Sequence, residues 1–339
     1  MIITNSEIDL NKIAFTSLIP LSVTLELLTE CNLRCRHCYI PKHNNRGISE
    51  NAIAILLKNL RKSGTLFLTF TGGEVFLRKD FLDILQEARR LRFNISIFTN
   101  GTLLCEDIVK ILSDIYVDEV AVSVYSMDEH IHDNITGTKG SLTQTLNALE
   151  ILGKYSINTI IKTPLMQINA MCYNDIYLFA KQFNIRCKFS PTIFAKTDGN
   201  QSPISLNMTD ENLNLIIKDI DTINKIFKND NDNQYFDDLP CSAGFNCCSI
   251  DCEGNVYPCN QFLLKCGNIF EDEFFNIWNN SQSLKELRGT QTKHLIECDN
   301  CSLVEFCYRC PGLSLLEKNN YLLCSDAAKT IACARKNNK

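Results

Sequence analysis

Short runs of β-branched and aromatic residues alternate with longer amphipathic segments over the first 190 residues. The short runs suit a pleated, buried surface and predict strands at 23–28, 66–70, 95–99, 120–125, 159–163 and 187–190. The longer segments carry apolar residues at helical spacing and predict helices near 50–62, 80–92, 105–114, 141–153 and 173–183. Repeated strand-then-helix units imply right-handed crossovers and a parallel sheet. The predicted fold is therefore α/β, a partial (β/α)6 TIM-like barrel with its chemistry at the carboxyl ends of the strands.

This alternation stops after the sixth strand. Residues 191–240 are rich in Asp, Asn and Lys and contain one predicted helix near 209–228. Cysteines then dominate, and twelve of the eighteen lie from Cys241 to Cys333. We expect metal rather than an apolar core to hold that last part together. The predicted domains are a core at 1–190, a connector at 191–240 and a cysteine-rich iron–sulfur module at 241–339.

Composition narrows the classes of function. The 339 residues are 45% hydrophobic and 22% charged, as in ordinary globular proteins, and the formal net charge is −5. The sequence has no run of Lys and Arg residues that would indicate a nucleic-acid partner. It also has no apolar run that approaches the length needed to span a membrane. The N-terminus lacks the basic start of a signal peptide, so we expect a cytoplasmic protein. Thiols stay reduced there, which favours metal ligation over disulfides.

The first predicted strand runs directly into three closely spaced cysteines, Cys31, Cys35 and Cys38. Three thiolates can bind three irons of a [4Fe–4S] cubane and leave the fourth iron open to a substrate. A zinc loop is the alternative, but structural zinc takes four ligands, and only His37 or His43 follows at a suitable spacing. The pattern resembles the CxxxCxxC motif of the radical S-adenosylmethionine (SAM) superfamily, with His37 at a position that is usually aromatic.

This resemblance implies that the cluster binds SAM and cleaves it reductively to a 5′-deoxyadenosyl radical. No side chain is assigned a catalytic role beyond this. Further strand-end segments resemble the family's SAM-binding segments, and their residues are Gly72, Gly73, Glu74, Asn100, Ser123 and Lys162. The glycines allow close backbone approach to a ligand, and Glu74 would meet the SAM ammonium. Asn100 and Ser123 would line the ribose and carboxylate, and Lys162 would either pair with that carboxylate or stay solvated.

A polar segment with two histidines, His130–Gly137, lies between the fourth strand and a helix. We interpret it as a loop without a catalytic role, because it also resembles a common sequence marker of the family. Ser141 and Gln144 form a capping-box signature that predicts the start of that helix.

The C-terminal cysteines form two constellations that resemble the SPASM module of radical SAM enzymes. The resemblance implies two auxiliary [4Fe–4S] clusters. The first would be held by Cys241, Cys247, Cys259 and Cys310. The second would be held by Cys298, Cys301, Cys307 and a late cysteine, for which the context of Cys333 fits better than that of Cys324. Cys310 follows a gap of two residues where the family has three, and Cys248, Cys252 or Cys266 could replace Cys247. A single zinc site at 298, 301, 307 and 310 is the alternative.

SPASM enzymes mostly modify side chains within peptides or proteins, so the predicted activity is maturation of a ribosomally made peptide through a cross-link, thioether or related oxidation. Radical modification of a small molecule, such as a haem side chain, is the second hypothesis. Formylglycine formation in sulfatases is disfavoured, because Asn260 stands where those enzymes carry a basic Asp. A non-catalytic iron–sulfur or zinc protein is a further alternative. It is disfavoured because such a protein would not need the iron site that the three-cysteine motif leaves open.

The resemblance also implies partners. These are a precursor peptide and an electron donor such as flavodoxin or ferredoxin. About twenty residues precede the first strand, too few for the leader-binding domain of many relatives, so we expect a separate leader-binding protein or recognition by the barrel itself.

Overall fold

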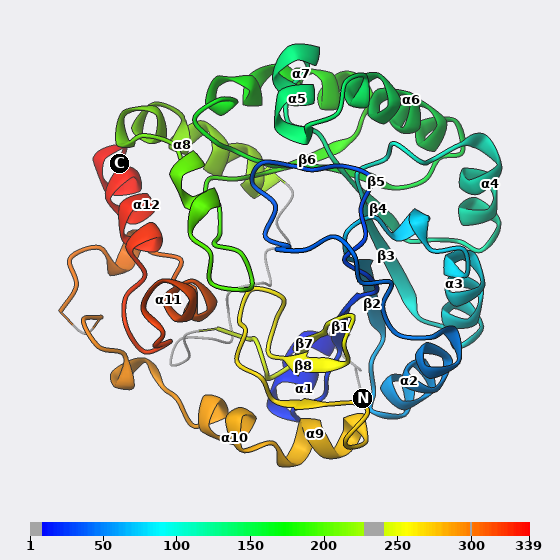
Figure 1. Ribbon diagram of the computed structural model, residues 1–339. Coiled ribbons are helices and arrows are strands. Elements are labelled where there is room, and N and C mark those ends of the chain that lie inside the picture. Colours follow the sequence, from blue (N-terminus) through cyan, green and yellow to red (C-terminus); the bar gives the residue numbers. More distant parts are fainter. Residues whose placement is uncertain (1–8, 227–240, 299) are drawn as a thin grey trace, which may run out of the picture.

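The computed structural model describes residues 9–226, 241–298 and 300–339. The first eight residues and the end of the predicted connector, 227–240, lie outside the described residues. The strands form one curved sheet in the order β6-β5-β4-β3-β2-β1-β7-β8-β9 (Figure 1). They are β1 (Ser22–Glu26), β2 (Phe67–Thr71), β3 (Asn94–Thr99), β4 (Glu119–Ser123), β5 (Thr159–Pro164), β6 (Arg186–Ser190), β7 (Cys247–Ile250), β8 (Asn255–Tyr257) and β9 (Gly267–Asn268).

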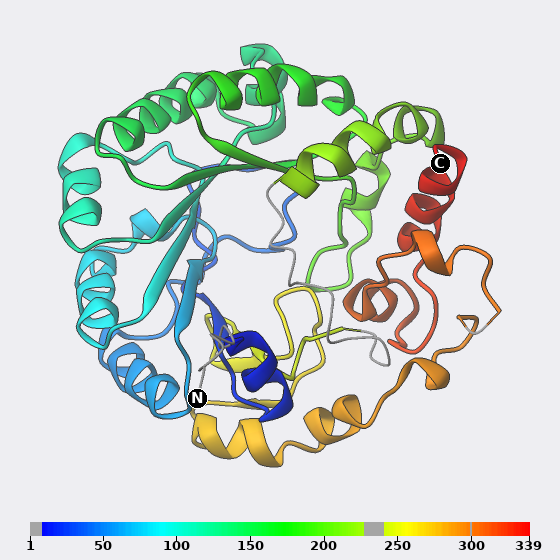
Figure 2. The same cartoon turned by 180° about the vertical axis from the view of Figure 1, so that it is seen from behind.

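Helices form a ring around this sheet, as both views show (Figures 1 and 2). The first half supplies α1 (Leu10–Thr16), α2 (Glu50–Lys62), α3 (Phe81–Arg90), α4 (Glu106–Asp114), α5 (Glu129–Thr136), α6 (Ser141–Lys154), α7 (Tyr173–Gln182) and α8 (Asp210–Ile226). The second supplies α9 (Phe274–Asn280), α10 (Gln282–Arg288), α11 (Pro311–Lys318) and α12 (Asp326–Asn337). Strands β1 to β6 pair in parallel in sequence order, which confirms the predicted α/β barrel class.

Alternating burial along the strands explains why the barrel keeps a usable interior. In β1, Val23 and Leu25 are fully buried in the core under the helices, because successive side chains of a strand point to opposite faces. Thr24 and Glu26 therefore face inward, where they line a cavity. The side chains of β1 that face the helices therefore pack in the core, and those that face the barrel interior are polar.

The cysteine-rich part extends the barrel sheet, a feature that the sequence did not predict. Strand β7 pairs with β1 in parallel, with Ser22 opposite Cys247 and Thr24 opposite Ser249. Strands β8 and β9 add antiparallel pairs beyond it. A four-residue strand containing two cysteines carries little periodic signal, and the parallel pairing joins residues more than 200 positions apart. The boundaries predicted for the three domains stay a prediction.

Two local expectations were wrong. Residues predicted as a polar loop form α5, capped by Asp128, whose Oδ1 accepts hydrogen bonds from the N–H groups of His130 and Ile131. The N-cap of α6 is Gly140 in a left-handed conformation. Ser141 is the first helical residue, and its hydroxyl donates to Asp133 Oδ1 at 2.8 Å instead of capping the helix. The hydrogen bond to Asp133 thus competes with the local capping pattern at Ser141.

No helix among the described residues combines the length and the apolar character that crossing a bilayer requires.

Candidate active site

The loop after β1 brings the first three cysteines to one cavity of about 210 Å³. Cys31, Cys35 and Cys38 line it together with residues from the ends of β2, β3 and β4. Burial, with smaller contributions from the neighbouring Cys38 and Cys31 thiols, raises the pKa of the Cys35 thiol to about 12. The N–H of Leu33 donates to Cys31 Sγ at 3.4 Å, a contact that favours a metal-bound thiolate. The donor set therefore fits a cluster with three protein ligands.

Two histidines also line this cavity. His43 Nε2 lies 3.5 Å from Cys38 Sγ. The His37 ring packs edge-on against Tyr125 with centroids 4.9 Å apart, and burial lowers the pKa of His37 to about 4, so the ring is neutral at pH 7. Among the described residues, no three His, Cys, Asp or Glu side chains are close enough together to hold a single metal ion.

The chain holds the cysteine loop from two sides. From α5, the carbonyls of Thr136 and Ile135 accept hydrogen bonds from the N–H groups of Arg34 and Arg36, at 3.0 and 2.9 Å. The segment that resembles a family marker is thus a structural support for the loop, in line with its lack of a predicted catalytic role.

The two glycines after β2 support the loop from the other side. A Cβ at Gly72 would lie 2.4 Å from the Leu28 carbonyl oxygen, and one at Gly73 would lie 2.1 Å from that of Glu30. The φ of Gly72 is also +148°, which side chains rarely adopt. Both glycines line the cavity, but the close approach that requires them is to the start of the cysteine loop. The sequence predicts that these glycines approach the ligand instead.

Glu74 accepts hydrogen bonds from its own protein. Its side chain is fully buried and is not part of the cavity lining. Its carboxylate accepts hydrogen bonds from the Thr99 hydroxyl and the Asn100 N–H, both at 2.8 Å, and from the Phe76 N–H at 3.2 Å. Burial raises its pKa, and these donors offset part of that rise. Glu74 therefore ties β2 to β3, and its contact with the SAM ammonium stays a prediction.

Asn100 and Ser123 lie where the sequence predicted, at the ends of β3 and β4, and both line the cavity. The Asn100 amide donates to Asn32 Oδ1 at 2.9 Å and lies 4.0 Å from Cys31 Sγ. Tyr125, which we had not singled out, lies with its hydroxyl 3.9 Å from Cys35 Sγ. Its position two residues after Ser123 on the same strand face was the available sequence signal.

Lys162 does not reach this cavity directly. Its ammonium lies 3.4 Å from the centroid of the Phe98 ring, and it is Phe98 that lines the cavity. Burial lowers the pKa of Lys162 to about 8. A cation–π contact holds the ammonium behind the aromatic ring, and pairing with the SAM carboxylate stays a prediction.

A second group of thiols gathers where β7, β8 and α11 meet. The Cys259 thiol has a pKa raised to about 12 by burial, with smaller contributions from three neighbouring thiols, those of Cys241, Cys247 and Cys310. This is the set that the SPASM resemblance implied for the first auxiliary cluster. The shorter gap before Cys310 does not prevent it from joining the group. Because Cys310 lies here, the alternative four-thiolate zinc site with Cys298 loses one of its members.

The third group of thiols includes Cys324, the alternative to Cys333 as the late ligand. Burial, with smaller contributions from the thiols of Cys324, Cys298 and Cys301, raises the pKa of Cys307 to about 11. Cys333, our choice from sequence context, is exposed on α12, between the buried Ala332 and Ala334. The structure therefore favours Cys324 as the late member of this group.

The remaining cysteines have other surroundings. Cys248 and Cys266 are buried next to the Arg288 guanidinium. Cys187 is buried, Cys172 is half-buried and Cys105 is exposed. Cys252 is buried and lines a separate cavity.

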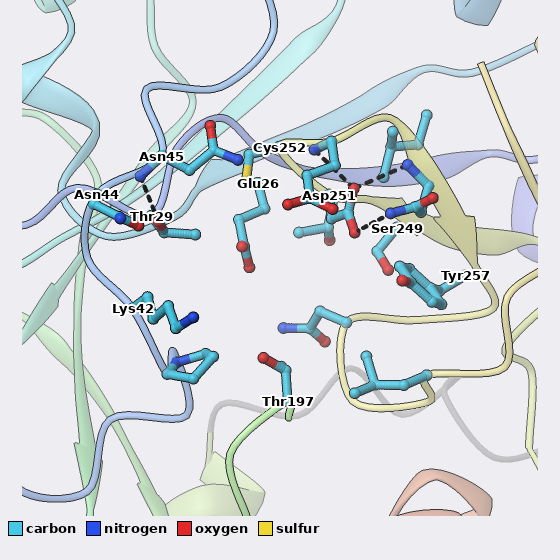
Figure 3. Close-up of a pocket in the computed structure, with 17 residues that line it drawn as sticks. Glu26, Thr29, Lys42, Asn44, Asn45, Thr197, Ser249, Asp251, Cys252 and Tyr257 are labelled. Carbon is cyan, nitrogen blue, oxygen red and sulfur yellow. Dashed lines mark hydrogen bonds between the residues drawn. The ribbon is translucent and has the colours of Figure 1, made fainter. Parts of the chain in front are cut away.

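That separate cavity, of about 470 Å³, lies between the loop after the cysteine motif and the β7–β8 hairpin (Figure 3). Most of its lining residues are of polar type, and the lining consists of Thr24, Glu26, Thr29, Pro41, Lys42, Asn44, Asn45, Thr197, Ser249, Ile250, Asp251, Cys252, Glu253, Asn255, Tyr257, Asn260 and Leu263. It thus lies beside residues that follow Cys38 on one side and residues that neighbour Cys247 and Cys259 on the other. Sequence reasoning missed this cavity, since its lining comes from four distant segments.

A partial α/β barrel with a thiol trio at its strand ends, and further thiol groups beside them, defines the class of iron–sulfur barrel enzymes. Comparison with known families agrees. The model of the radical SAM superfamily matches residues 25–177, and the SPASM model, an iron–sulfur cluster-binding domain, matches residues 241–311. The chain is a radical SAM enzyme with a C-terminal SPASM domain.

Individual relatives are distant. The chain is 26% identical over 279 residues to the sporulation killing factor maturation protein SkfB of Bacillus subtilis, covering 79% of this chain and 67% of SkfB. It is 23% identical over 318 residues to an AdoMet-dependent heme synthase of Oleidesulfovibrio alaskensis, covering 85% and 81%. Streptococcus suis SuiB bound to its precursor peptide SuiA superimposes with a TM-score of 0.72 at 18% identity, covering 97% and 83%, which shows a shared fold.

Proposed function

We propose that this chain is a maturase that uses the 5′-deoxyadenosyl radical to modify a ribosomally made peptide, through a cross-link, a thioether or a related oxidation. The observation that carries the proposal is the polar cavity between the cysteine loop and the β7–β8 hairpin (Figure 3). It offers a side chain a place beside both the first thiol trio and the nearest auxiliary thiols. The names of SkfB and SuiB with its precursor peptide support the same reading.

We further propose the ligand sets that the thiol groups suggest. These are Cys31, Cys35 and Cys38 for the SAM-binding cluster, Cys241, Cys247, Cys259 and Cys310 for one auxiliary cluster, and Cys298, Cys301, Cys307 and Cys324 for the other. When bound, such clusters supply one-electron chemistry that cleaves SAM.

The chain's own residues position and shield these groups. Gly72, Gly73, Asn100 and Ser123 would contact SAM, since all four line the cavity of the thiol trio. Buried Glu74 fixes the edges of that cavity by joining β2 to β3. The surrounding barrel excludes water and stray hydrogen donors from a reactive radical.

Two alternative activities have less support from the cavity. Small-molecule chemistry is an alternative because three relatives are AdoMet-dependent heme synthases. The many polar residues that line the second cavity nevertheless suit a peptide side chain better than a large apolar macrocycle. Formylglycine formation is disfavoured because Asn260, which lines the same cavity, cannot act as a carboxylate base.

The proposed partners are a precursor peptide, an electron donor such as flavodoxin or ferredoxin, and a separate leader-binding protein. We propose a cytoplasmic location, where eighteen free cysteines would stay reduced.

The test is to incubate the reconstituted, reduced enzyme and SAM with the peptide encoded nearest its gene. We expect 5′-deoxyadenosine and a peptide that loses about two mass units per bond formed, or that keeps its mass and gains one deuteron from heavy water in an epimerisation. Cys35→Ala serves as the matched inactive control. If no neighbouring peptide changes while a tetrapyrrole raises 5′-deoxyadenosine, the small-molecule alternative is correct.

A further inference from the structure

The second cavity contains a carboxylate without a matching cation. Glu26 projects from the inner face of β1, and Figure 3 shows its carboxylate pointing into the middle of the cavity. The Tyr39 hydroxyl donates to Oε2 at 2.9 Å, and Oε1 accepts no hydrogen bond from the residues that the structure describes. Burial and the nearby Asp251 disfavour the charged form, so the pKa of Glu26 rises to about 7. A partly buried acid of this kind gains most from a ligand that brings a positive charge.

Ser249 gives a second, independent sign of a ligand. Its side chain is only 5% exposed, and its hydroxyl has no hydrogen-bond partner among the described residues. It lines the same cavity from β7, directly opposite Thr24 of β1. A buried hydroxyl without a partner costs about 1–3 kcal/mol. A bound polar group that reaches Ser249 would remove that cost.

The charges around the cavity select the ligand further. Asp251 and Glu253 add negative charge from the β7–β8 hairpin, and Lys42 contributes the cation of the lining. Asp251 is already occupied, because its carboxylate accepts hydrogen bonds from the Glu253 and Asn255 N–H groups, both at 2.9 Å. Lys42 is exposed and forms no ion pair within the described part of the chain. Glu253 is exposed, and Glu26 is therefore the more buried acid that keeps a free oxygen, in a lining with a net negative charge.

We propose that this cavity binds a cationic side chain of the substrate peptide, a lysine or arginine, with Glu26 as its charge partner and Ser249 as a hydrogen-bonding partner. The inference rests on the proposed peptide maturation and names a side-chain class that the substrate presents. Its position beside the cysteine loop would hold that residue next to the thiol trio. Glu26 acts here as a binding and positioning residue, and no proton transfer is assigned to it.

The test measures binding to the reconstituted, SAM-loaded enzyme by calorimetry, with three acetylated tripeptide amides as probes. These are Gly-Lys-Gly, its uncharged counterpart with norleucine, and Gly-Glu-Gly. We expect the lysine peptide to bind at least about tenfold more tightly than the norleucine peptide. Equal binding of the two, no saturable binding of the lysine peptide, or tighter binding of the glutamate peptide would each overturn the proposal. The last outcome would assign the cavity to anions held by Lys42.

Variants locate the effect. Glu26→Gln keeps an acceptor for Tyr39 and should weaken binding of the lysine peptide about tenfold, and Ser249→Ala should weaken it about threefold. Glu253→Gln is the matched control, because it removes the same charge from an exposed position of the same lining. It should change binding by less than about twofold, since an exposed charge is screened. An equal effect of both Glu variants would reduce the site to general charge attraction and overturn the assignment.

The experiments can reject the cationic site and peptide maturation independently of each other. Modification of the neighbouring peptide without any preference for lysine over norleucine would leave maturation standing and reject the cationic site. Preference for the lysine probe that depends on Glu26, with no modified peptide, would reject maturation and retain the site.

Discussion

The guanidinium of Arg335 forms a two-point ion pair with Asp221, with Nε–Oδ2 at 2.7 Å and Nη2–Oδ1 at 2.9 Å. This pair joins α12 to α8, two helices that lie side by side (Figure 1). On this helix Ala332 and Ala334 are buried, whereas Cys333 between them is exposed. The last helix is therefore a brace for the ring of helices, and its cysteine is exposed.

Iron content tests this assignment. Cys324→Ala should lower the iron of the anaerobically reconstituted protein from about twelve to about eight atoms per chain, because a four-iron cluster loses a ligand. Cys333→Ala should keep about twelve and serves as the matched control. The reverse pattern would restore the assignment that the sequence context suggested, and stoichiometric zinc with about four irons would reject both auxiliary clusters.

The brace itself should contribute to stability. Arg335 and Asp221 are mostly buried, with side chains 15% and 21% exposed, so Arg335→Ala should lower the free energy of unfolding by about 2 kcal/mol and lower the Tm. Lys339→Ala removes the ion pair to Glu305, whose side chains are 72% and 75% exposed, and should change stability little. Equal Tm values for the two variants would show that the Arg335 pair is not a brace.

Glu74 should matter for stability more than for SAM contact. Glu74→Ala leaves three donors without their acceptor, those of Thr99, Asn100 and Phe76, and should cost about 3 kcal/mol. Glu74→Gln retains one carbonyl oxygen and should cost about half as much. Glu87→Gln on the surface of α3 is the control. Full thermal stability of Glu74→Ala combined with loss of SAM affinity would instead support the direct contact that the sequence predicted.

Binding of the lysine probe should depend on pH. With a pKa of about 7, Glu26 is mostly protonated at pH 6 and mostly ionised at pH 8, so binding of the cation should strengthen about tenfold between these values. Other titratable or charged groups around it are Tyr39, Lys42, Asp251, Cys252, Glu253 and Tyr257. Glu26→Gln should flatten the profile. A slope that survives in Glu26→Gln would assign the titration to one of these neighbours.

Loss of the thiol trio should abolish SAM cleavage and leave the two auxiliary clusters in place. The triple variant Cys31→Ala, Cys35→Ala, Cys38→Ala should keep about eight irons and lose all formation of 5′-deoxyadenosine. Iron assays and chromatography of the products give both readouts. Retention of about twelve irons would show that the trio holds no cluster.

The amino-acid sequence by itself determined the barrel and the first cysteine site. Strand and helix patterns are local, so β1 to β6 and α2, α3, α4, α6 and α7 formed within a residue or two of the predicted ranges. The trio of Cys31, Cys35 and Cys38 lies within eight positions directly after a strand, and a short loop keeps near neighbours together. Strand ends of a parallel sheet meet at one edge, which is why Asn100 and Ser123 were predictable as well.

Tertiary structure alone decided which distant groups face one another. Whether Glu74 contacts a ligand or the Asn100 N–H depends on how β2 lies against β3. Lys162 is separated from the cavity by the Phe98 ring, a contact that its position in the sequence does not reveal. The exposure of Cys333 depends on how α12 packs against the rest of the fold. The second cavity exists because β7 pairs with β1 across more than 200 residues. Such contacts form only when the chain closes its sheet, and no local pattern encodes them.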